Sequence, residues 1–464
     1  MKNTRYLIES NPLKAILIFS IPIIIGNFFQ QTYTMVDSIV VGRYVGEAAL
    51  AAIGASYSFT NIFIWLSVGG GIGASVIVSH HFGQRDFSTM KTAINTALIS
   101  FLFVSIFLLF MGIISGRHIM KALNTPNEVL DQAMIYLNIY FYGLPFLFMY
   151  NIISSMFNAL GKSKLPLCFL IFSSTFNIFL DIVFVKIFNS GIAGVAWATL
   201  IAQGLSAFMS LITLLKIQNK FSINETDNHK LFDMKECISI SKIAFPSILQ
   251  QATVAIGMML VQSVVNDFGK QALAGFSAAA RIENFVAVPW VALSSSMSTF
   301  TAQNIGAGKN ERIRLGFRTT NKLIAFFGIL FMIVLELSAD SIIRFFLDKN
   351  ISDRALEVGT GYIKFLGWCS YLLGFKMCVD GMLRGAADTR AFTVANLVNL
   401  SLRVAISFSL APKYGVSLVW IASPIGWSAN FLISYMHYVR KNLRETENKS
   451  VDLQSNGLNY KSTS

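Results

Sequence analysis

The chain has 464 residues, of which 54% are hydrophobic and only 13% are charged, with a formal net charge of +13. A soluble domain carries about 25% charged residues, so this composition excludes an ordinary water-soluble domain and indicates an integral membrane protein. The basic residues are scattered over short segments between apolar runs, which is typical of membrane topology and excludes a nucleic-acid-binding surface.

The apolar runs predict an all-α membrane protein with twelve transmembrane helices. Each run is close to the ~20 residues that cross the hydrocarbon core of a bilayer. We expect the spans at residues 13–41, 52–78, 92–114, 131–157, 165–187, 190–216, 237–266, 277–302, 317–338, 356–380, 390–411 and 415–439.

A polar interruption near the middle of the chain divides these spans into two groups of six. Residues 218–236 predict a cytoplasmic linker between an amino-terminal lobe, 1–217, and a carboxyl-terminal lobe, 237–440, and residues 441–464 predict a polar cytoplasmic tail. Segments on the linker's side of the membrane hold more than twice as many Lys and Arg residues as the opposite side. Both termini are therefore expected in the cytoplasm, with the chain in the inner (plasma) membrane of the cell.

The two halves also resemble each other in sequence. Landmarks recur at a nearly constant separation of 223 to 225 residues, among them Pro22 and Pro246, Trp65 and Trp290, Gly83 and Gly306. Six spans per half is an even number, so both halves cross the membrane in the same direction. This predicts an internal parallel repeat with a transport pathway between the two lobes.

Two acidic residues lie inside predicted spans of the amino-terminal lobe, Asp37 in the first and Asp181 in the fifth. Inserting an ionised side chain at the centre of a span costs ~2.5–3.5 kcal/mol, so an acid at such a position indicates a functional or structural role. The rise of 1.5 Å per residue places both ~7–8 Å inside the outer ends of their helices. Asn177 lies one turn before Asp181 on the same helical face, and Thr199 in the sixth span comes to a similar depth.

These four side chains form an all-oxygen set, which predicts a site for Na⁺ or for a transferable proton. Burial and neighbouring like charge favour the protonated form of at least one of the two carboxyl groups. The alternative is that each aspartate is a structural group, hydrogen-bonded to neighbouring helices. No cofactor is expected beyond the coupling ion, H⁺ or Na⁺.

Further polar residues of the same lobe are predicted to line the substrate pathway. Gln30 and Tyr33 share the helical face of Asp37, and Asn151 belongs to the fourth span. The alternative for Gln30 and Tyr33 is simple hydrogen bonding between helices. Pro22 removes a backbone hydrogen bond and predicts a bend in the helix that carries Asp37, either static or changing with protonation.

The carboxyl-terminal lobe lacks this acidic set but has its own ionisable residues inside the spans: Arg281, Glu283, Glu336, Lys376, Asp380 and Arg403. Lys376 and Asp380 are one helical turn apart and predict an ion pair. No role is predicted for the others. In the second span, the glycines from Gly69 to Gly73 predict close helix packing or a hinge.

The chain resembles the multidrug and toxic compound extrusion (MATE) family over residues 10–440. The resemblance is carried by the first span, with Gln30-Gln31, Tyr33 and Val36-Asp37-Ser38, by Asn158-Ala159-Leu160-Gly161-Lys162-Ser163-Lys164-Leu165-Pro166, by Asn177-Ile178-Phe179-Leu180-Asp181, and by Pro424-Ile425-Gly426-Trp427. It implies a V-shaped antiporter of twelve helices that exports drugs and metabolites against an inward flux of H⁺ or Na⁺.

The resemblance also implies site residues. In the family an aspartate of the first span and an Asn-x-x-x-Asp pair of the fifth form a cation or proton site, which matches Asp37, Asn177 and Asp181, and Thr199 matches the hydroxyl that joins them. The seventh span has no acid in its interior here. The chain therefore looks closer to the DinF-like branch than to the NorM-like branch.

Together these features predict a monomeric secondary active antiporter that exports small, often cationic, organic compounds by alternating access. The alternative is a flippase for a lipid-linked oligosaccharide or related lipid, for which Arg281, Lys376 and Arg403 would supply a cationic cavity. A membrane-embedded enzyme would require an aspartate-rich or His-plus-acid motif at a membrane face. The sequence contains neither, so no enzymatic activity is expected.

Overall fold

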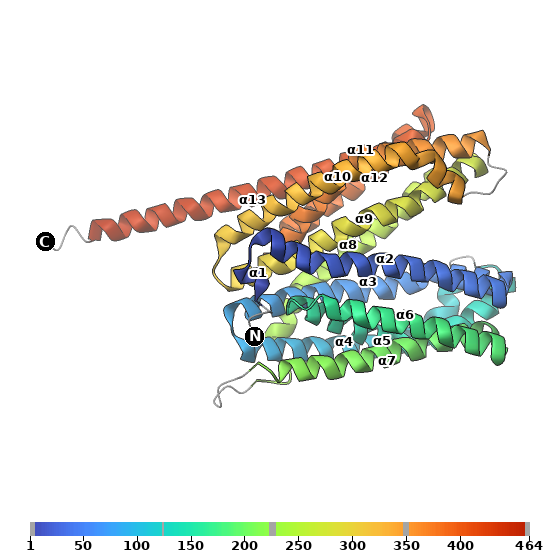
Figure 1. The fold of residues 1–464 in the computed structure, drawn as a ribbon, viewed down its shortest axis with the longest axis horizontal. Helices are drawn as coiled ribbons and strands as arrows, with labels where there is room; N and C mark the ends of the chain where they lie inside the picture. The colour runs from blue at the N-terminus through green and yellow to red at the C-terminus, as the bar shows by residue number, and fades with distance from the viewer. Residues whose placement is uncertain (1–4, 123–124, 222–228, 347–351, 460–464) are drawn as a thin grey trace.

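A computed structural model of the chain describes residues 5–122, 125–221, 229–346 and 352–459 (Figure 1). The described residues form a short helix, twelve long helices and one π-helical turn. Their bounds are α1 Tyr6–Glu9, α2 Pro12–Tyr44, α3 Glu47–Gln84, α4 Phe87–Ala122, α5 Asn127–Ala159, α6 Lys164–Ile182, η1 Val183–Ile187, α7 Gly191–Gln218, α8 Met234–Asn266, α9 Gly269–Gly306, α10 Asn310–Phe346, α11 Asp353–Gly385, α12 Thr389–Tyr414 and α13 Ser417–Asn459.

The long helices confirm the predicted architecture. Each of the twelve predicted spans falls on one of α2 to α13, with η1 completing the span of α6. Ten of them, within the described residues, are long and apolar enough to cross a membrane. The other two are α11, which carries Lys364, Lys376 and Asp380 along its length, and α13, whose second half is polar.

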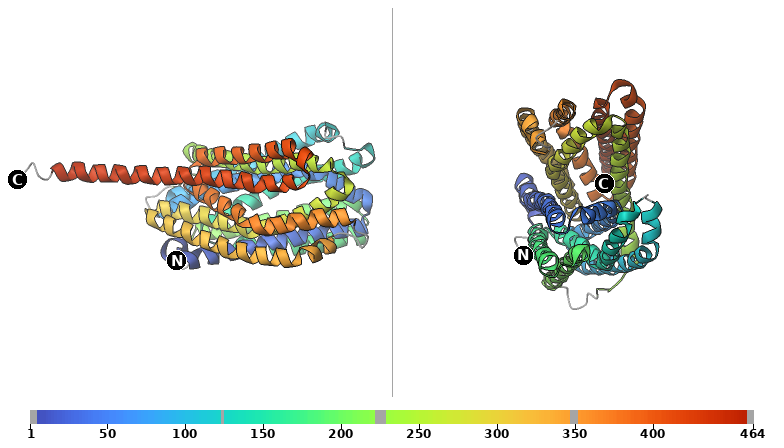
Figure 2. Two further views of the ribbon diagram at one scale, coloured as in Figure 1. Left: turned by 90° about the horizontal axis from the view of Figure 1, so that it is seen from above. Right: turned by 90° about the vertical axis from the view of Figure 1, so that its right-hand side faces the viewer.

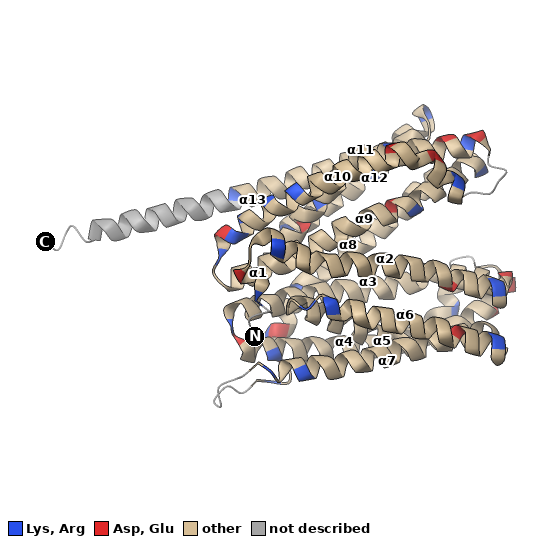
Figure 3. Ribbon diagram, viewed as in Figure 1, with Lys and Arg blue, Asp and Glu red and all other residues tan. Residues whose placement is uncertain are grey.

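The surface of the helices fits a lipid environment. Large apolar side chains project outward from α4 and α10, for example Phe103, 74% exposed, and Leu337, 82% exposed. Charged residues gather toward the helix ends, which leaves the middle of the amino-terminal lobe almost free of them (Figure 3). An apolar belt between polar ends is what a bilayer requires of a spanning protein.

Helices α2 to α7 form one lobe and α8 to α13 the other, and the lobes diverge from one end of the molecule to give a V shape (Figures 1 and 2). The end where the lobes meet is called the closed end here, and the opposite end the open end. Helix α1 lies at the closed end, and α13 continues beyond it as a single long helix.

The lobes touch where helices α3 and α9 cross. A Cβ atom at Gly83 would lie 2.2 Å from the carbonyl oxygen of Gln303, and one at Gly306 would lie 2.1 Å from that of His80. These two glycines are equivalent in the internal repeat, so the crossing is reciprocal. Only glycine permits backbones to approach this closely.

A second close contact joins α3 to α8 and confirms the packing expected of the glycine run. A Cβ atom at Gly69 would lie 2.8 Å from the backbone nitrogen of Ile248, and one at Gly73 would lie 2.5 Å from that of Ala244. Helix α3 therefore packs against α8 of the second lobe through Gly69 and Gly73, which lie one turn apart on the same face.

The amino-terminal segment, residues 5–10, adds hydrogen bonds at the closed end. Tyr6 donates its hydroxyl proton to the carbonyl oxygen of Gly161 in the first lobe, at 3.1 Å. From the second lobe, Asn304 Nδ2 donates to the Leu7 carbonyl at 3.1 Å and Arg312 Nη2 donates to the Ser10 carbonyl at 2.6 Å. This segment is bonded to both lobes.

Candidate cation-coupling site

Helices α2, α6 and α7 bring the four predicted coupling residues together in the first lobe. The carboxyl groups of Asp37 on α2 and Asp181 on α6 lie close enough to interact electrostatically. Asp181 is fully buried and Asn177 is 2% exposed. Two carboxyl groups therefore share one site inside the lobe.

The side chain of Asn177 connects this pair to α7. In one amide orientation it accepts a hydrogen bond from the Tyr33 hydroxyl, and its Nδ2 donates to Thr199 Oγ1 at 3.4 Å. In the flipped orientation, which satisfies more of its neighbours, Nδ2 donates to Asp181 Oδ2 at 3.2 Å and Oδ1 accepts from the Thr199 backbone N–H at 3.1 Å. In both orientations Asn177 contacts α2 and α7 at once.

Each aspartate retains an oxygen that the described protein groups leave unsatisfied. Asp37 Oδ1 and Asp181 Oδ1 are buried without a hydrogen-bond partner. A buried oxygen without a hydrogen-bond partner costs folding free energy unless it binds a proton or a cation. The donor set of carboxylate, amide and hydroxyl oxygens fits Na⁺ or H⁺; the described residues contain no cluster of three or more His, Cys, Asp and Glu placed to bind a metal ion.

Two features of the site escaped the sequence analysis. Tyr136 on α5 lies within electrostatic reach of both carboxyl groups, and it lines a small cavity of about 10 Å³ beside Thr199 and Gln203. The π-helical turn η1 begins at Val183, two residues after Asp181. Turns of this kind are frequent at functional sites, because they redirect the side chains on either side of them.

The remaining predicted residues of the first lobe lie in different surroundings. Tyr33 belongs to the coupling cluster through Asn177. Gln30 is exposed, and Asn151 donates to the carbonyl oxygen of Leu147 on its own helix at 2.9 Å. Pro22 is buried, and α2 continues through it without interruption.

A central cleft of about 450 Å³ separates the lobes toward the open end. From α2 it is lined by Gln31, Thr34 and Ser38, and from α9 by Arg281 and Asn284. Gln31, adjacent to the predicted Gln30, is thus the glutamine that faces the cleft. At one side of the cleft Phe28 and Phe285 stack with their ring centroids 6.2 Å apart.

The second lobe confirms the predicted ion pair. Lys376 Nζ lies 2.6 Å from Asp380 Oδ2 and also donates to Asn396 Oδ1 at 2.9 Å. Among the other ionisable residues, Glu283 accepts a hydrogen bond from Tyr362, and Glu336 pairs with Lys364 at 3.0 Å. Their sequence separations of 79 and 28 residues explain why local spacing did not reveal these partners.

Comparison with known proteins agrees with this arrangement. The MatE family model matches residues 22–183 and again residues 246–409. The two matches begin at Pro22 and Pro246, which are equivalent positions of the internal repeat. The duplication seen in the sequence is therefore the repeat of the family itself.

Individual relatives cover nearly the whole chain. It is 29% identical over 392 residues to the probable multidrug resistance protein YpnP of Bacillus subtilis, which covers 84% of this chain and 86% of YpnP. It is 22% identical over 438 residues to the multidrug export protein MepA of Staphylococcus aureus, covering 93% of this chain and 95% of MepA. A solved MOP superfamily transporter from Pyrococcus furiosus has the same fold, with a TM-score of 0.87 at 20% identity, covering 96% of this chain and 99% of that one.

The resemblance to MATE transporters is thus confirmed, while the DinF-like branch stays a prediction. The two matches to the family model together span well over half of the sequence. The chain belongs to the MatE family and is a multi-pass membrane transporter.

Proposed function

We propose that the chain is a secondary active antiporter that exports small organic compounds, cationic ones among them, in exchange for H⁺ or Na⁺. It works by alternating access in the plasma membrane, with both termini in the cytoplasm, so that the closed end faces inward and the cleft opens outward. The names of its relatives YpnP and MepA support multidrug export. A lipid-linked oligosaccharide flippase is not favoured, because these relatives are named for drug export.

The observation that carries this proposal is that the Asp37 and Asp181 carboxyl groups, on two different helices, lie close enough to interact electrostatically. Two like charges 4 Å apart repel by about 4 kcal/mol at an effective dielectric constant of 20. A bound proton or Na⁺ removes this repulsion and lets α2 and α6 approach. An energy of this size is enough to shift a two-state equilibrium about a thousandfold.

Coupling follows if the loaded and empty site favour different conformations. Loading from the outside through the open cleft favours the state that releases substrate outward, and discharge to the cytoplasm resets the carrier. The ion can only shift the equilibrium by its differential affinity for the two states. Substrate and ion then exchange without sharing the same atoms.

The test is gradient-driven efflux of ethidium from vesicles that contain the full chain, with an imposed pH or Na⁺ gradient. Asp37→Asn and Asp181→Asn are each expected to lower the gradient-dependent rate at least about tenfold, because a single acid cannot form the pair. The matched control is Asp131→Asn, at an exposed aspartate that pairs with Arg117 at the surface, and this variant is expected to keep the wild-type rate. Full gradient-driven efflux in both site variants would refute the coupling role.

A further inference from the structure

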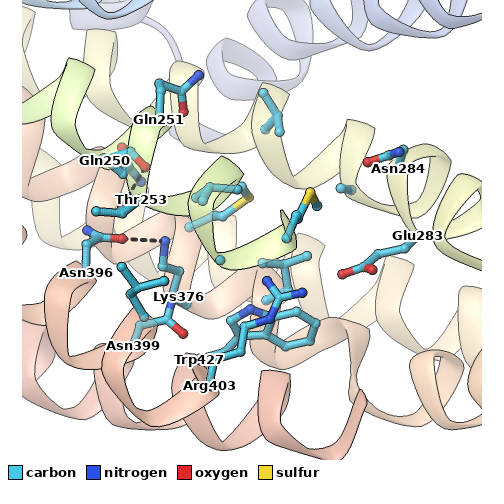
Figure 4. A pocket seen from close by; sticks show the side chains of 18 residues that line it. Gln250, Gln251, Thr253, Glu283, Asn284, Lys376, Asn396, Asn399, Arg403 and Trp427 are labelled. Carbon is cyan, nitrogen blue, oxygen red and sulfur yellow. Dashed lines mark hydrogen bonds between the residues drawn. The ribbon is translucent and has the colours of Figure 1, made fainter. Parts of the chain in front are cut away.

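A second cavity, of about 240 Å³, lies inside the carboxyl-terminal lobe between α8, α9, α11, α12 and α13 (Figure 4). One part of its wall is apolar, from Met258, Leu400 and Trp427. The other part is polar, with amide side chains such as Gln250 and Asn399 beside three ionisable groups. A cavity with an apolar body and a few convergent polar groups is the usual form of a small-molecule site.

The ionisable groups of this cavity differ in how well they are satisfied. Lys376 is neutralised by Asp380 and bonded to Asn396. Glu283 is the only carboxylate among the described lining residues, and it accepts a hydrogen bond from Tyr362. Arg403 Nε, in contrast, is buried without a hydrogen-bond partner, and no salt bridge joins Arg403 to a carboxylate among the described residues.

In Figure 4 the side chains of Arg403 and Glu283 point toward each other from α12 and α9, with the cavity between them. A guanidinium group that is partly desolvated and unpaired is costly, and an anion that reaches it recovers that cost. Its planar donors match the two oxygens of a carboxylate. Arg403 is therefore a position at which the cavity selects for negative charge.

The cavity also adjoins the central cleft. Asn284 lines both of them, and Arg281 lies one turn before it on α9, exposed in the cleft. The cavity and the cleft together hold three cationic side chains, Arg281, Lys376 and Arg403. Two carboxylates oppose them, Glu283 and the Lys376 partner Asp380, which leaves one positive charge in excess. A monovalent organic anion would balance this charge.

We propose that the carboxyl-lobe cavity and the adjoining wall of the cleft bind organic anions that join a carboxylate to an apolar body. Arg281 attracts the anion in the cleft, Arg403 holds the carboxylate, and the Met258, Leu400 and Trp427 wall receives the apolar part. The inference rests on the proposed export function and extends its substrates beyond cations. The coupling site in the other lobe is separate from this one.

The experiment compares two fluorescent probes that differ only in charge, dansylglycine and its neutral amide, dansylglycinamide. Binding of each to the purified full chain in detergent is measured by fluorescence titration, and transport of each in proteoliposomes. The wild type is expected to bind dansylglycine at least about tenfold more tightly than the amide. A hydrogen bond to a charged group contributes about 1.5–3 kcal/mol, and 1.4 kcal/mol corresponds to a factor of ten in affinity. Arg403→Gln is expected to lower this preference to near unity, and Arg403→Lys to keep part of it.

Two further variants keep the test decisive. Arg281→Gln changes only an exposed residue of the cleft, and it is expected to slow the transport of dansylglycine more than the transport of the amide. This variant tests the proposal even if Arg403→Gln does not fold. Arg344→Gln removes an arginine that pairs with Asp340 at the exposed end of α10, and it is expected to keep the wild-type preference. Equal affinity of the wild type for both probes, or an unchanged preference in Arg403→Gln and Arg281→Gln, would overturn the inference.

Ethidium efflux in the same proteoliposomes separates this failure from failure of the proposed function. If the wild type exports ethidium with the imposed gradient but does not distinguish the dansyl probes, only the anion site is wrong. If it prefers dansylglycine but moves neither probe nor ethidium in response to a gradient, the site stands and the antiport function is wrong.

Discussion

Asn177 is the residue through which the candidate coupling site is assembled. It contacts Tyr33 on α2, Thr199 on α7 and, in the flipped orientation, Asp181 one turn along α6. Because each neighbour lies on a different element, a change in the charge of the carboxyl pair reaches three helices through one amide. Thr199 is the outer member of this network, since its hydroxyl also donates to Val195 O on its own helix at 3.1 Å.

Replacing Thr199 tests this network without touching a carboxyl group. Thr199→Val removes the hydroxyl oxygen from the donor set of carboxylate, amide and hydroxyl oxygens, so the coupling-ion concentration that gives half-maximal ethidium efflux is expected to rise about tenfold. Thr199→Ser keeps the hydroxyl and is expected to remain within about twofold of the wild type. Equal effects of the two substitutions would show that the hydroxyl does not contribute.

The buried pair of Lys376 and Asp380 makes a second prediction, on stability. Lys376→Met leaves Asp380 unpaired in the core of the second lobe and is expected to cost about 3–5 kcal/mol. The double variant Lys376→Met/Asp380→Leu removes both charges and is expected to recover most of that loss. Thermal unfolding in detergent measures the difference, and a double variant as unstable as the single one would contradict it.

At the scale of elements, most of the spans could be predicted from the sequence, because long apolar runs mark the segments that cross a bilayer. The convergence of Asp37 and Asp181 could be predicted as well, since both lie at the same depth on helices that run in one direction. The position of Tyr136 could not be predicted, because its approach to the pair depends on how α5 packs against α7. The sequence of a single chain does not show which helices pack against each other. The π-helical turn after Asp181 likewise leaves no local residue pattern.

The crossing of α3 and α9 yields a prediction about conformation. Gly83→Ala and Gly306→Ala each place a methyl group about 2 Å from a backbone carbonyl oxygen of the other lobe, and the backbone cannot yield as a side chain can. The closed end is therefore expected to separate, with a longer distance between spin labels at Gln84→Cys and Glu311→Cys in a background without the four native cysteines.

The control for this experiment lies on the same helix. A Cβ atom at Gly54 would meet no atom within 4 Å, so Gly54→Ala is expected to leave the label distance unchanged. If Gly83→Ala and Gly306→Ala also left it unchanged, the glycine crossing would not hold the lobes together.

At the scale of the whole molecule, the two lobes are joined at one end and separated at the other. The central cleft is lined by polar residues of α2 and α9 at the open end, while a small polar cavity of about 50 Å³ lies between the lobes nearer the closed end, beside Ser75 and Ser298. A carrier that works by alternating access must have a state in which the space between its lobes is open at one end and closed at the other, as it is here.

Two serines on these walls test which side the cleft faces. A cysteine in place of Ser38, in the cleft, is expected to react rapidly with a membrane-impermeant thiol reagent added outside intact cells. A cysteine in place of Ser75, in the inner cavity, is expected to react at least about tenfold more slowly, because opening to that side requires a domain motion. The reverse order of reactivity would show that the open end faces the cytoplasm.

The amino-terminal segment links the two lobes at the closed end. Residues 5–10 hold hydrogen bonds to both lobes, each worth about 1 kcal/mol, so the closed end cannot part without releasing them. Under the proposed alternating access, these hydrogen bonds add to the barrier of the step that opens the closed end and also oppose leakage through it. Removing them is then expected to give faster turnover and a less well maintained gradient.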